Sequence, residues 1–444
     1  MKIACLVDGE HYIPNIKDTL DQLSVNYDIR CAIFIGGTEK IGSKVDIACE
    51  IGYDVKFAEK DDKPDPEMVG NFAKDCGAAV VLDLSDEPVV NYDVRMAIAC
   101  EVLGRELVYR GADFEFTPMR FKDLLNKRSI SIWGTGKRIG KTAIGGFVGR
   151  VLKEHGFKPG IVTLSRGGPN KPEILRGDQI QLKPEFFLDM QSKGFHAASD
   201  NFEDALTSRV ITFGCKRMGG GFSGKPFSTI IEQGAKMADE HPDVETIVLE
   251  GSGATFPEIK TDKVILLIGA QQPASHVLGF FGPYRIKLAD LVIMAMCEQP
   301  MADREKVDYL YREIKKINPK CRVVQSIFRP KPLGDIEGMR VIFATTAPPA
   351  VIDKLVKYLE ENYKCAVSGV STHLSNKPLL GKDIERYIDS ADVFLTELKA
   401  GAVSVVTKTA IERGMDVVYC DNIPEIVGGD GDDLEREILD LMGN

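Results

Sequence analysis

The sequence lacks the residue spacings that mark disulfide scaffolds and zinc-binding proteins. Its ten cysteines are scattered singly, without a CxxC or CxxxC pair. Its six histidines never occur at the i, i+4 spacing of a helical zinc site. We therefore expect free thiols and no structural metal.

Long apolar runs and an excess of positive charge are also missing. No run approaches the roughly 20 apolar residues that span a bilayer, and the N-terminal apolar run stops at Asp8, too early for a signal-peptide core. Lys and Arg number 56 against 66 Asp and Glu, a net charge of −10. We expect a cytoplasmic protein with no nucleic-acid or membrane partner.

The charge is unevenly distributed along the chain. Residues 1–125 hold 14 basic and 24 acidic side chains, whereas residues 128–225 hold 16 basic and 8 acidic ones. An acidic protein thus carries one basic segment. A small ligand with two phosphates explains it better than nucleic acid, because no RNA-binding run of aromatic residues accompanies the basic ones.

Short β-branched runs alternate with helical patterns along the 444 residues, which is typical of α/β proteins with mostly parallel sheets. We predict a small doubly wound N-terminal domain at 1–126 and a P-loop NTPase-like domain at 127–330. The α/β extension at 331–444 is either part of that domain or a third one. A linker is expected at 116–118, followed by a helical stretch to residue 128. The strands expected in the P-loop domain are 129–133, 160–164, 246–250, 263–268, 291–295 and 322–327.

The strongest signal is SIWGTGKRIGKTA at 131–143, a strand followed by a glycine-rich loop and a helix start. Such a loop turns backbone N–H groups toward phosphate, Lys141 would reach the β- and γ-phosphates, and Thr142 would hold Mg²⁺. The spacing departs from GxxxxGK[ST], since Thr135 replaces the first glycine. The predicted nucleotide site comprises Gly134, Thr135, Gly136, Lys137, Arg138, Ile139, Gly140, Lys141, Thr142 and Ala143.

A nucleotide site of this kind needs an acidic group at a neighbouring strand end. The strand at 246–250 ends in Glu250 and a glycine turn, so Glu250 is a metal ligand, a water-orienting group or a surface carboxylate. No [NT]KxD motif for reading guanine follows a late strand, which favours ATP. The predicted cofactors are ATP and Mg²⁺.

Cations cluster in further loops of the basic segment. Arg166 follows the second strand of the P-loop domain, and the loop KRMGGGFSGKP begins at Lys216. Each cation alone could be a solvated surface residue, but together they suit phosphate. The predicted substrate-binding residues are Arg166, Lys216, Arg217, Gly220 and Lys225.

A polar turn follows the first strand of the N-terminal domain. Asp8, Glu10 and His11 stand in this turn, at the carboxyl edge of the predicted sheet. They either face a substrate as a lid or acid–base element or form a capping turn. We include them among the predicted substrate-binding residues, with both interpretations open.

GTGKRIGKT together with LEGSG resembles dethiobiotin synthetase and its P-loop relatives. The lysine that marks the partition-ATPase branch is absent, because Gly136 occupies its position. Over nearly the full chain, the order VDGEHY, GTGKRIGKTA, LSRGGP, KRMGGGFSGKP, VLEGSGA and FRPKPLGDIEG resembles the cyclic 2,3-diphosphoglycerate synthetases, an archaeal enzyme family with bacterial relatives.

This resemblance implies an ATP-dependent ligase that closes 2,3-diphosphoglycerate into its cyclic phosphoanhydride and releases ADP and phosphate. Lys141, Glu250 and Arg166 are then the predicted catalytic residues. Two alternatives remain: a kinase of a small phosphorylated acid such as 2-phosphoglycerate, and a partition-type regulatory ATPase. A homodimer is expected from the general frequency of twofold assemblies.

Overall fold

The computed structural model describes residues 1–37, 41–61, 63–181 and 183–443, which form two compact units. The first unit comprises Met1–Arg120 and Pro273–Leu288, and the second comprises Phe121–Gln272 and Ala289–Asn444. The segment 273–288 packs in the first unit although it lies inside the predicted P-loop domain. Its Phe281 ring contacts Phe116 edge-on, and the Tyr284 hydroxyl accepts a hydrogen bond from the Met119 N–H.

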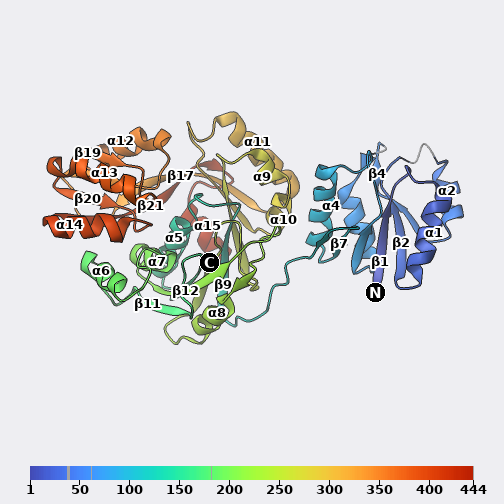
Figure 1. Cartoon of the computed structure of the whole chain (residues 1–444), viewed down its shortest axis with the longest axis horizontal. Coiled ribbons are helices and arrows are strands. Elements are labelled where there is room, and N and C mark those ends of the chain that lie inside the picture. Colours follow the sequence, from blue (N-terminus) through green and yellow to red (C-terminus); the bar gives the residue numbers. More distant parts are fainter. Residues whose placement is uncertain (38–40, 62, 182, 444) are drawn as a thin grey trace. The chain divides into compact units, whose positions relative to one another are not determined.

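The first unit is a doubly wound α/β fold. Its sheet has the strand order β3-β2-β1-β6-β7-β8, parallel except for β8, and helices cover both faces (Figure 1). Its elements are β1 (Lys2–Val7), α1 (Ile13–Ser24), β2 (Asp28–Phe34), α2 (Lys44–Ile51), β3 (Val55–Phe57), β4 (Glu59–Lys60), β5 (Lys63–Pro64), α3 (Pro66–Asp75), β6 (Val80–Asp83), α4 (Tyr92–Gly104), β7 (Val108–Arg110), β8 (Glu115–Phe116), α9 (Ala274–Leu278) and α10 (Gly282–Lys287).

The second unit is built on one long sheet. The strand order is β11-β12-β10-β14-β9-β15-β16-β17-β21-β20-β18-β19, with β13 beside β12. Strands β12 to β17 form one parallel run and β21 to β19 form another. The antiparallel pair of β17 with β21 joins the two runs, so the C-terminal extension continues the sheet of the P-loop region.

The elements of the P-loop region are β9 (Arg128–Gly134), α5 (Lys141–Glu154), β10 (Pro159–Ser165), β11 (Glu173–Arg176), α6 (Pro184–Ser192), α7 (Asp200–Ser208), β12 (Ile211–Met218), β13 (Ser228–Thr229), α8 (Ile231–Glu240), β14 (Thr246–Glu250), β15 (Lys263–Gly269), β16 (Leu291–Ala295), α11 (Arg304–Ile317) and β17 (Arg322–Pro332). The elements that follow are β18 (Arg340–Ala344), the 3₁₀ turn η2 (Pro349–Val351), α12 (Ile352–Tyr363), β19 (Ala366–Ser371), α13 (Lys377–Tyr387), η3 (Ile388–Ser390), β20 (Val393–Thr396), the π-helical turn η4 (Ala402–Thr407), α14 (Lys408–Arg413), β21 (Asp416–Gly429) and α15 (Leu434–Leu441).

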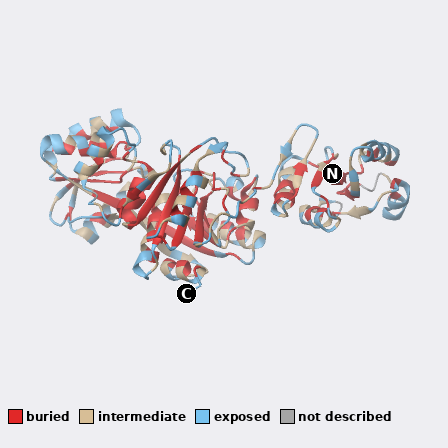
Figure 2. Ribbon diagram, turned by 90° about the horizontal axis from the view of Figure 1, so that it is seen from below, coloured by how far each residue is buried: buried red, intermediate tan, exposed pale blue. Residues whose placement is uncertain are grey.

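The core of the second unit lies on both faces of its central strands. Figure 2 shows buried residues concentrated on these strands, and helix α7 is buried along almost its whole length. Residues 265–268 of β15 are fully buried. Strands covered on both faces form continuous apolar runs, which is why the sequence predicts them well.

Two local predictions need correction. The stretch between the linker and residue 128 is not helical: Lys122 makes a parallel bridge with Ile259, and Leu124 and Leu125 pack on a core cluster, which holds the backbone extended. Helix α7 and strand β12 are absent from the predicted elements, and the end of β12 contains Lys216 and Arg217, which we placed in a loop. Strand β12 lies between β10 and β11, although Gly214 and two cations interrupt its apolar pattern.

Helix α5 approaches β14 closely because Gly145 has no side chain. A Cβ at this position would lie 1.2 Å from the Glu250 Oε1. We expect Gly145→Ala to lower the free energy of unfolding by about 1–3 kcal/mol or more, since the buried Glu250 side chain must leave the space that the methyl group takes. Urea unfolding measures this effect. The matched control is Gly381→Ala on α13, where no atom lies within 4 Å of the added methyl and stability should rise by about 0.5–1 kcal/mol. Equal changes in both variants would contradict the close approach.

Candidate functional site

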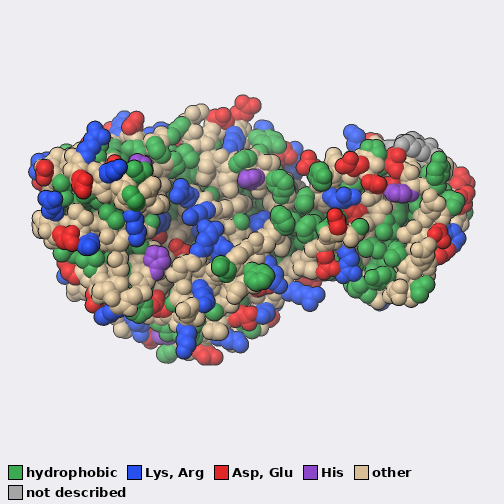
Figure 3. Space-filling view, viewed as in Figure 1, with side chains coloured by type: hydrophobic (Ala, Val, Ile, Leu, Met, Phe, Trp, Pro, Cys, Tyr) green, Lys and Arg blue, Asp and Glu red, His purple; other side chains and the backbone are tan. Residues whose placement is uncertain are grey.

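The carboxyl ends of both parallel runs of the second unit meet over the middle of β21. Strand β20 pairs with residues 416–419 of β21, and β17 pairs with residues 420–429. Loops from both runs therefore surround one cavity of about 590 Å³. Open α/β sheets bind ligands at such carboxyl edges. Lys and Arg side chains gather in a hollow on the face of the larger unit that Figure 3 shows.

The glycine-rich loop between β9 and α5 forms one wall of the cavity. Gly140 has φ of 91° and ends the loop, so Lys141 is the first residue of α5. The Lys141 Nζ donates a hydrogen bond to the Gly136 carbonyl (2.6 Å). Burial lowers the pKa of Lys141 to about 8, although Asp200 and Glu250 oppose this shift. A buried cation turned back on its own loop is suited to an incoming phosphate.

Most of the predicted nucleotide site reaches the cavity. The residues of the loop and helix start that line it are Lys137, Arg138, Gly140, Lys141, Thr142 and Ala143. The other members of the predicted set do not line the cavity and instead stabilise the conformation of the loop. Thr135 donates a hydrogen bond to Gln272, Ile139 packs in the core, and Gly134 and Gly136 allow Lys141 and Gln272 to approach.

Glu250 lies behind the cavity wall, which the glycine turn after it lines. Its carboxylate is buried next to Gly145, and Oε1 has no hydrogen-bond partner among the described residues. Burial and the nearby Asp200 raise the pKa of Glu250 well above its usual value.

Helix α7, which the sequence analysis missed, brings more carboxylates to this place. Asp200 lines the cavity, Glu203 forms an ion pair with Lys399, and Asp204 is fully buried. Neither carboxylate oxygen of Asp204 has a hydrogen-bond partner within the part of the chain that the structure describes. The run DNFED after Ser199 could have indicated a capped helix.

The buried acids make stability depend on pH. Burial, Glu250 and Glu203 raise the pKa of Asp204, so the folded protein retains a proton that the unfolded chain loses. The contribution of Asp204 to stability should therefore be greatest at low pH and fall as pH rises. We expect Asp204→Asn to raise the free energy of unfolding by about 1 kcal/mol or more at pH 8 and by little at pH 4. Urea unfolding of the ligand-free protein at both pH values measures this.

The exposed Asp189 provides the control for this prediction. Its carboxylate lies on α6 and pairs with Lys193 in solvent. Asp189→Asn should change stability by less than about 0.5 kcal/mol at either pH. An Asp204→Asn variant that follows the wild-type pH curve without a growing difference would show that Asp204 is not the titrating group.

Arg166 and Arg217 lie close together, although only Arg166 lines the cavity. Arg166 lines the cavity, and a Cβ atom added to Gly253 would lie 2.7 Å from its Nη2. Arg217 donates hydrogen bonds to the carbonyls of Ser252 (2.8 Å) and Gly219 (2.7 Å). Burial and the neighbouring Arg166 lower the pKa of Arg217. Two adjacent guanidinium groups favour an anion between them.

Lys216, Gly220 and Lys225, like Arg217, do not line the cavity. Lys216 donates to the Asn170 side chain (2.6 Å), and Lys225 forms an ion pair with Glu258 (3.1 Å). Gly220 lies beside Thr255.

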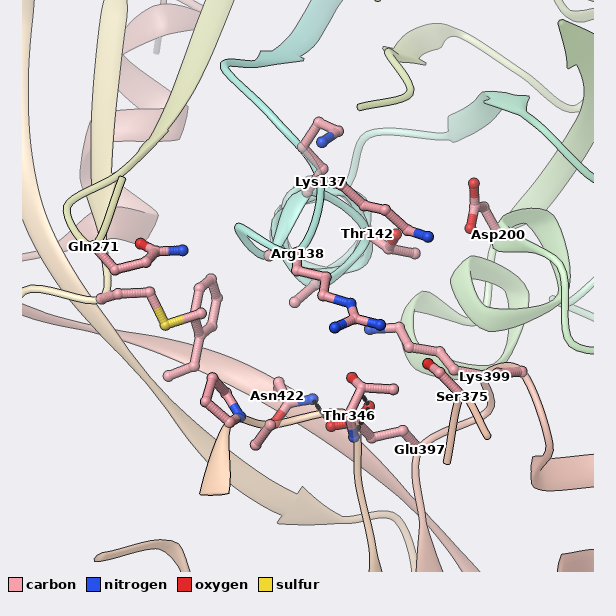
Figure 4. Close-up of a pocket in the computed structure, with 18 of the residues that line it drawn as sticks. Lys137, Arg138, Thr142, Asp200, Gln271, Thr346, Ser375, Glu397, Lys399 and Asn422 are labelled. Carbon is pink, nitrogen blue, oxygen red and sulfur yellow. Dashed lines mark hydrogen bonds between the residues drawn. The ribbon is translucent and has the colours of Figure 1, made fainter. Parts of the chain in front are cut away.

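The opposite wall comes from loops of the C-terminal extension, and the sequence analysis named none of their residues. Figure 4 shows the side chains of Thr346, Ser375, Glu397, Lys399 and Asn422 around the cavity. Glu397 accepts hydrogen bonds from the Thr346 hydroxyl (2.6 Å) and the Asn422 amide (3.1 Å). The loops of Thr346, Ser375 and Glu397 directly follow parallel strands, the same signal that singled out Arg166.

One end of the cavity is apolar. Met296 and Met301 follow β16, Phe328 lies within β17, and Val351 and Leu355 come from η2 and α12. This end suits a planar, uncharged group, whereas the end near Arg166 suits anions.

The predicted acid–base turn of the N-terminal domain lies in the first unit. Asp8 is fully buried and accepts hydrogen bonds from the N–H groups of Glu10 (2.9 Å) and Asp86 (2.6 Å). The His11 Nδ1 lies 2.9 Å from the Asp8 Oδ1. These contacts favour the capping interpretation for Asp8, Glu10 and His11.

The described residues contain neither a cluster of metal ligands nor a membrane-spanning helix. Within them, no three His, Cys, Asp or Glu side chains are grouped to hold a metal ion. None of the helices in this part of the chain is both long and apolar enough to span a membrane.

The parallel sheet, the glycine-rich loop and the lysine at the start of α5 define a nucleotide-binding protein of the P-loop class. Family models for the three domains of cyclic 2,3-diphosphoglycerate synthetase match the N-terminal (residues 2–117), P-loop (129–327) and C-terminal (332–423) regions. The chain belongs to the cyclic 2,3-diphosphoglycerate synthetase family, as its sequence motifs predict.

The sequences of known relatives match this chain over nearly its whole length. The cyclic 2,3-diphosphoglycerate synthetase of Methanothermobacter thermautotrophicus is 50% identical over 99% of this chain and 95% of its own length. The synthetase of Methanothermus fervidus is 48% identical over 99% and 96%, respectively. Among solved structures, LpxK of Aquifex aeolicus in complex with ATP covers 73% of this chain and 90% of its own, with 13% identity and a TM-score of 0.43.

Proposed function

We propose that this protein is an ATP-dependent ligase that joins the two phosphates of 2,3-diphosphoglycerate into a cyclic phosphoanhydride and releases ADP and inorganic phosphate. The observation that carries the proposal is a single cavity with two sets of cations. Lys141 and Arg138 come from the P-loop, and Arg166 and Lys399 reach the cavity from other elements. Two polyanions can then be held side by side while their mutual repulsion is reduced.

The two alternatives have less support. A partition-type ATPase needs a nucleotide switch, not a second anion site in the same cavity, and the relatives along the full chain are named synthetases. A kinase of a phosphorylated acid would use the same P-loop but would leave a stable phosphoester and release no inorganic phosphate.

The cavity divides into parts that match the two substrates. We infer that the base of ATP lies at the apolar end with Met296 and Phe328 and that its phosphates lie on the loop at Lys141. The phosphorylated acid then occupies the end near Arg166 and Lys399.

The donor set of this cavity fits Mg²⁺. Thr142 offers a hydroxyl and Asp200 a carboxylate to the same space, and Mg²⁺ is usually held by one or two carboxylates together with substrate phosphates. When bound, the ion would neutralise charge on the transferring phosphoryl group. The sequence-based assignment of Glu250 as a ligand remains a prediction, because its carboxylate lies behind the wall.

The chain needs no nucleophile of its own. A phosphate oxygen of the acid attacks the γ-phosphorus of ATP and ADP leaves. The neighbouring phosphate then attacks the activated phosphorus, which closes the ring and expels inorganic phosphate. Lys141 stabilises the charge on the transferring group, while Arg166 holds the acid in place. Exclusion of water by the C-terminal wall protects the anhydride.

The experiment that tests this function is ³¹P NMR of the purified protein with MgATP and 2,3-diphosphoglycerate. The expected result is a new upfield anhydride resonance, together with one equivalent each of ADP and inorganic phosphate. ADP without inorganic phosphate when 2-phosphoglycerate replaces the diphosphate would indicate the kinase. Slow loss of ATP with unchanged acid resonances would indicate a regulatory ATPase.

The order of steps can be tested with the same assay. Substrate labelled with ¹⁸O in its phosphates should deliver label to the released inorganic phosphate, because the attacking oxygen leaves with it. Released phosphate without label would contradict this order.

We further infer a homodimer in the cytoplasm. The dimer rests on the general frequency of twofold assemblies. Light scattering during size-exclusion chromatography tests it, since a monomer has a mass of 48.9 kDa.

A further inference from the structure

The segment after β20 places two charged side chains at the cavity and has an unusual backbone conformation. Glu397 and Lys399 both line the cavity, and the next residue, Ala400, has a positive φ of 46°. The π-helical turn η4 follows directly. A left-handed alanine is strained and persists only where its surroundings fix it, and π-helical turns occur frequently at functional sites. This conformation holds Lys399 against the cavity.

Lys399 occupies an unusual position for a lysine. Its Nζ forms an ion pair with Glu203 of α7 (2.9 Å), and its side chain is 28% exposed. Glu397 is nearby, but its carboxylate already accepts hydrogen bonds from Thr345, Thr346 and Asn422. In the ligand-free protein the ammonium group of Lys399 therefore has one short ionic contact, with Glu203 of α7. The other side of the Lys399 side chain lines the cavity.

This lysine could supply a charge that the P-loop lacks. The loop has Gly136 where the partition ATPases have a lysine, and Lys399 brings a cation to the same cavity from a distant part of the chain. An ammonium group on a flexible stem can exchange one anion for another, unlike the planar guanidinium of Arg166.

We propose that Lys399 binds a phosphate of the acid substrate by exchanging its contact with Glu203 for one with the phosphate. This inference rests on the proposed function, since it assigns a substrate-binding residue to the same site. Glu203 then acts as a competing anion that holds Lys399 in place until the substrate enters.

The test combines steady-state kinetics with isothermal titration of 2,3-diphosphoglycerate into the protein. Lys399→Met should raise KM and Kd for the acid by at least about tenfold, the loss of one charged hydrogen bond. KM for ATP should stay within about twofold, since the P-loop is unchanged. Lys399→Arg should recover part of the loss. The matched control is Lys408→Met on α14, whose lysine pairs with Glu412 in solvent and does not line the cavity.

A second variant separates substrate binding from a structural role. Glu203→Gln removes the competing anion, so the acid should bind about threefold or more tightly. A purely structural ion pair predicts weaker binding or none of this gain. If Lys399→Met does not fold, the neutral pair Lys399→Met with Glu203→Gln replaces it and is compared with Glu203→Gln alone.

The titration distinguishes this inference from the proposed function. Wild-type protein that binds the acid without forming the cyclic product would contradict the ligase, while the variants still decide the role of Lys399. Unchanged Kd and KM for the acid in Lys399→Met would overturn the inference. Wild-type protein that does not bind the acid would overturn both.

Discussion

Lys141→Met is expected to lower kcat by at least about 10³-fold, because the lysine at the start of α5 neutralises charge on the transferring phosphoryl group. In the ligand-free protein its Nζ contacts the Gly136 carbonyl, so its ion-pairing capacity is free for ATP. The formation of the cyclic product by ³¹P NMR and the release of inorganic phosphate both measure this loss. Undiminished cyclisation would contradict the site.

The same variant should be more stable than the wild type. Burial lowers the pKa of Lys141 from 10.5 to about 8, so the folded protein favours the neutral amine. The contribution of Lys141 to wild-type stability should therefore be unfavourable at neutral pH, where the buried amine must be charged, and become less unfavourable between about pH 8 and 10. Methionine removes this dependence and should raise the Tm at pH 7. Lys153→Met, in the last turn of the same helix, is the control and should leave turnover unchanged.

Arg166→Met is the second change with a large expected effect. Arg166 lines the cavity at the end of β10 and, unlike Arg217, donates no hydrogen bond within the described ranges that would hold its guanidinium in place. Loss of a bidentate contact with phosphate should lower kcat/KM for the acid by about 10²-fold or more. ATP affinity should be nearly unchanged, so a split between the two KM values is the diagnostic result.

The control for Arg166 is an arginine of the same sheet that is far from the cavity lining. Arg176 on β11 pairs with Asp178 and Asp243 at the surface. Arg176→Met should leave both KM values unchanged. If Arg166→Met instead weakens ATP and the acid equally, Arg166 serves the nucleotide, and the division of the cavity proposed above is wrong.

Much of the fold could be predicted because central parallel strands have an unmistakable pattern. Strands such as β15 are buried on both faces, so almost every residue is apolar. Helix α7 and strand β12 were missed for the opposite reason. Their sequences mix charges and glycines with apolar residues, since one end of β12 holds Arg217 near the cavity and α7 turns carboxylates inward.

Of the two walls of the candidate site, only the P-loop wall could be predicted from the sequence. A P-loop is local: a strand, a loop and a helix start within 13 residues fix where Lys141 and Thr142 point, so the motif indicates its own geometry. The full-length order of motifs likewise indicated the family, which the family models confirm.

The other wall of the cavity was decided by tertiary structure. Lys399 and Asn422 reach the P-loop only because β21 pairs antiparallel with β17 and turns a second parallel run toward the first. Such pairing joins residues almost 100 positions apart, and no spacing in the sequence specifies it. The sequence by itself determined the phosphate-binding loop and the family, while the sheet pairing decided which distant side chains share the cavity.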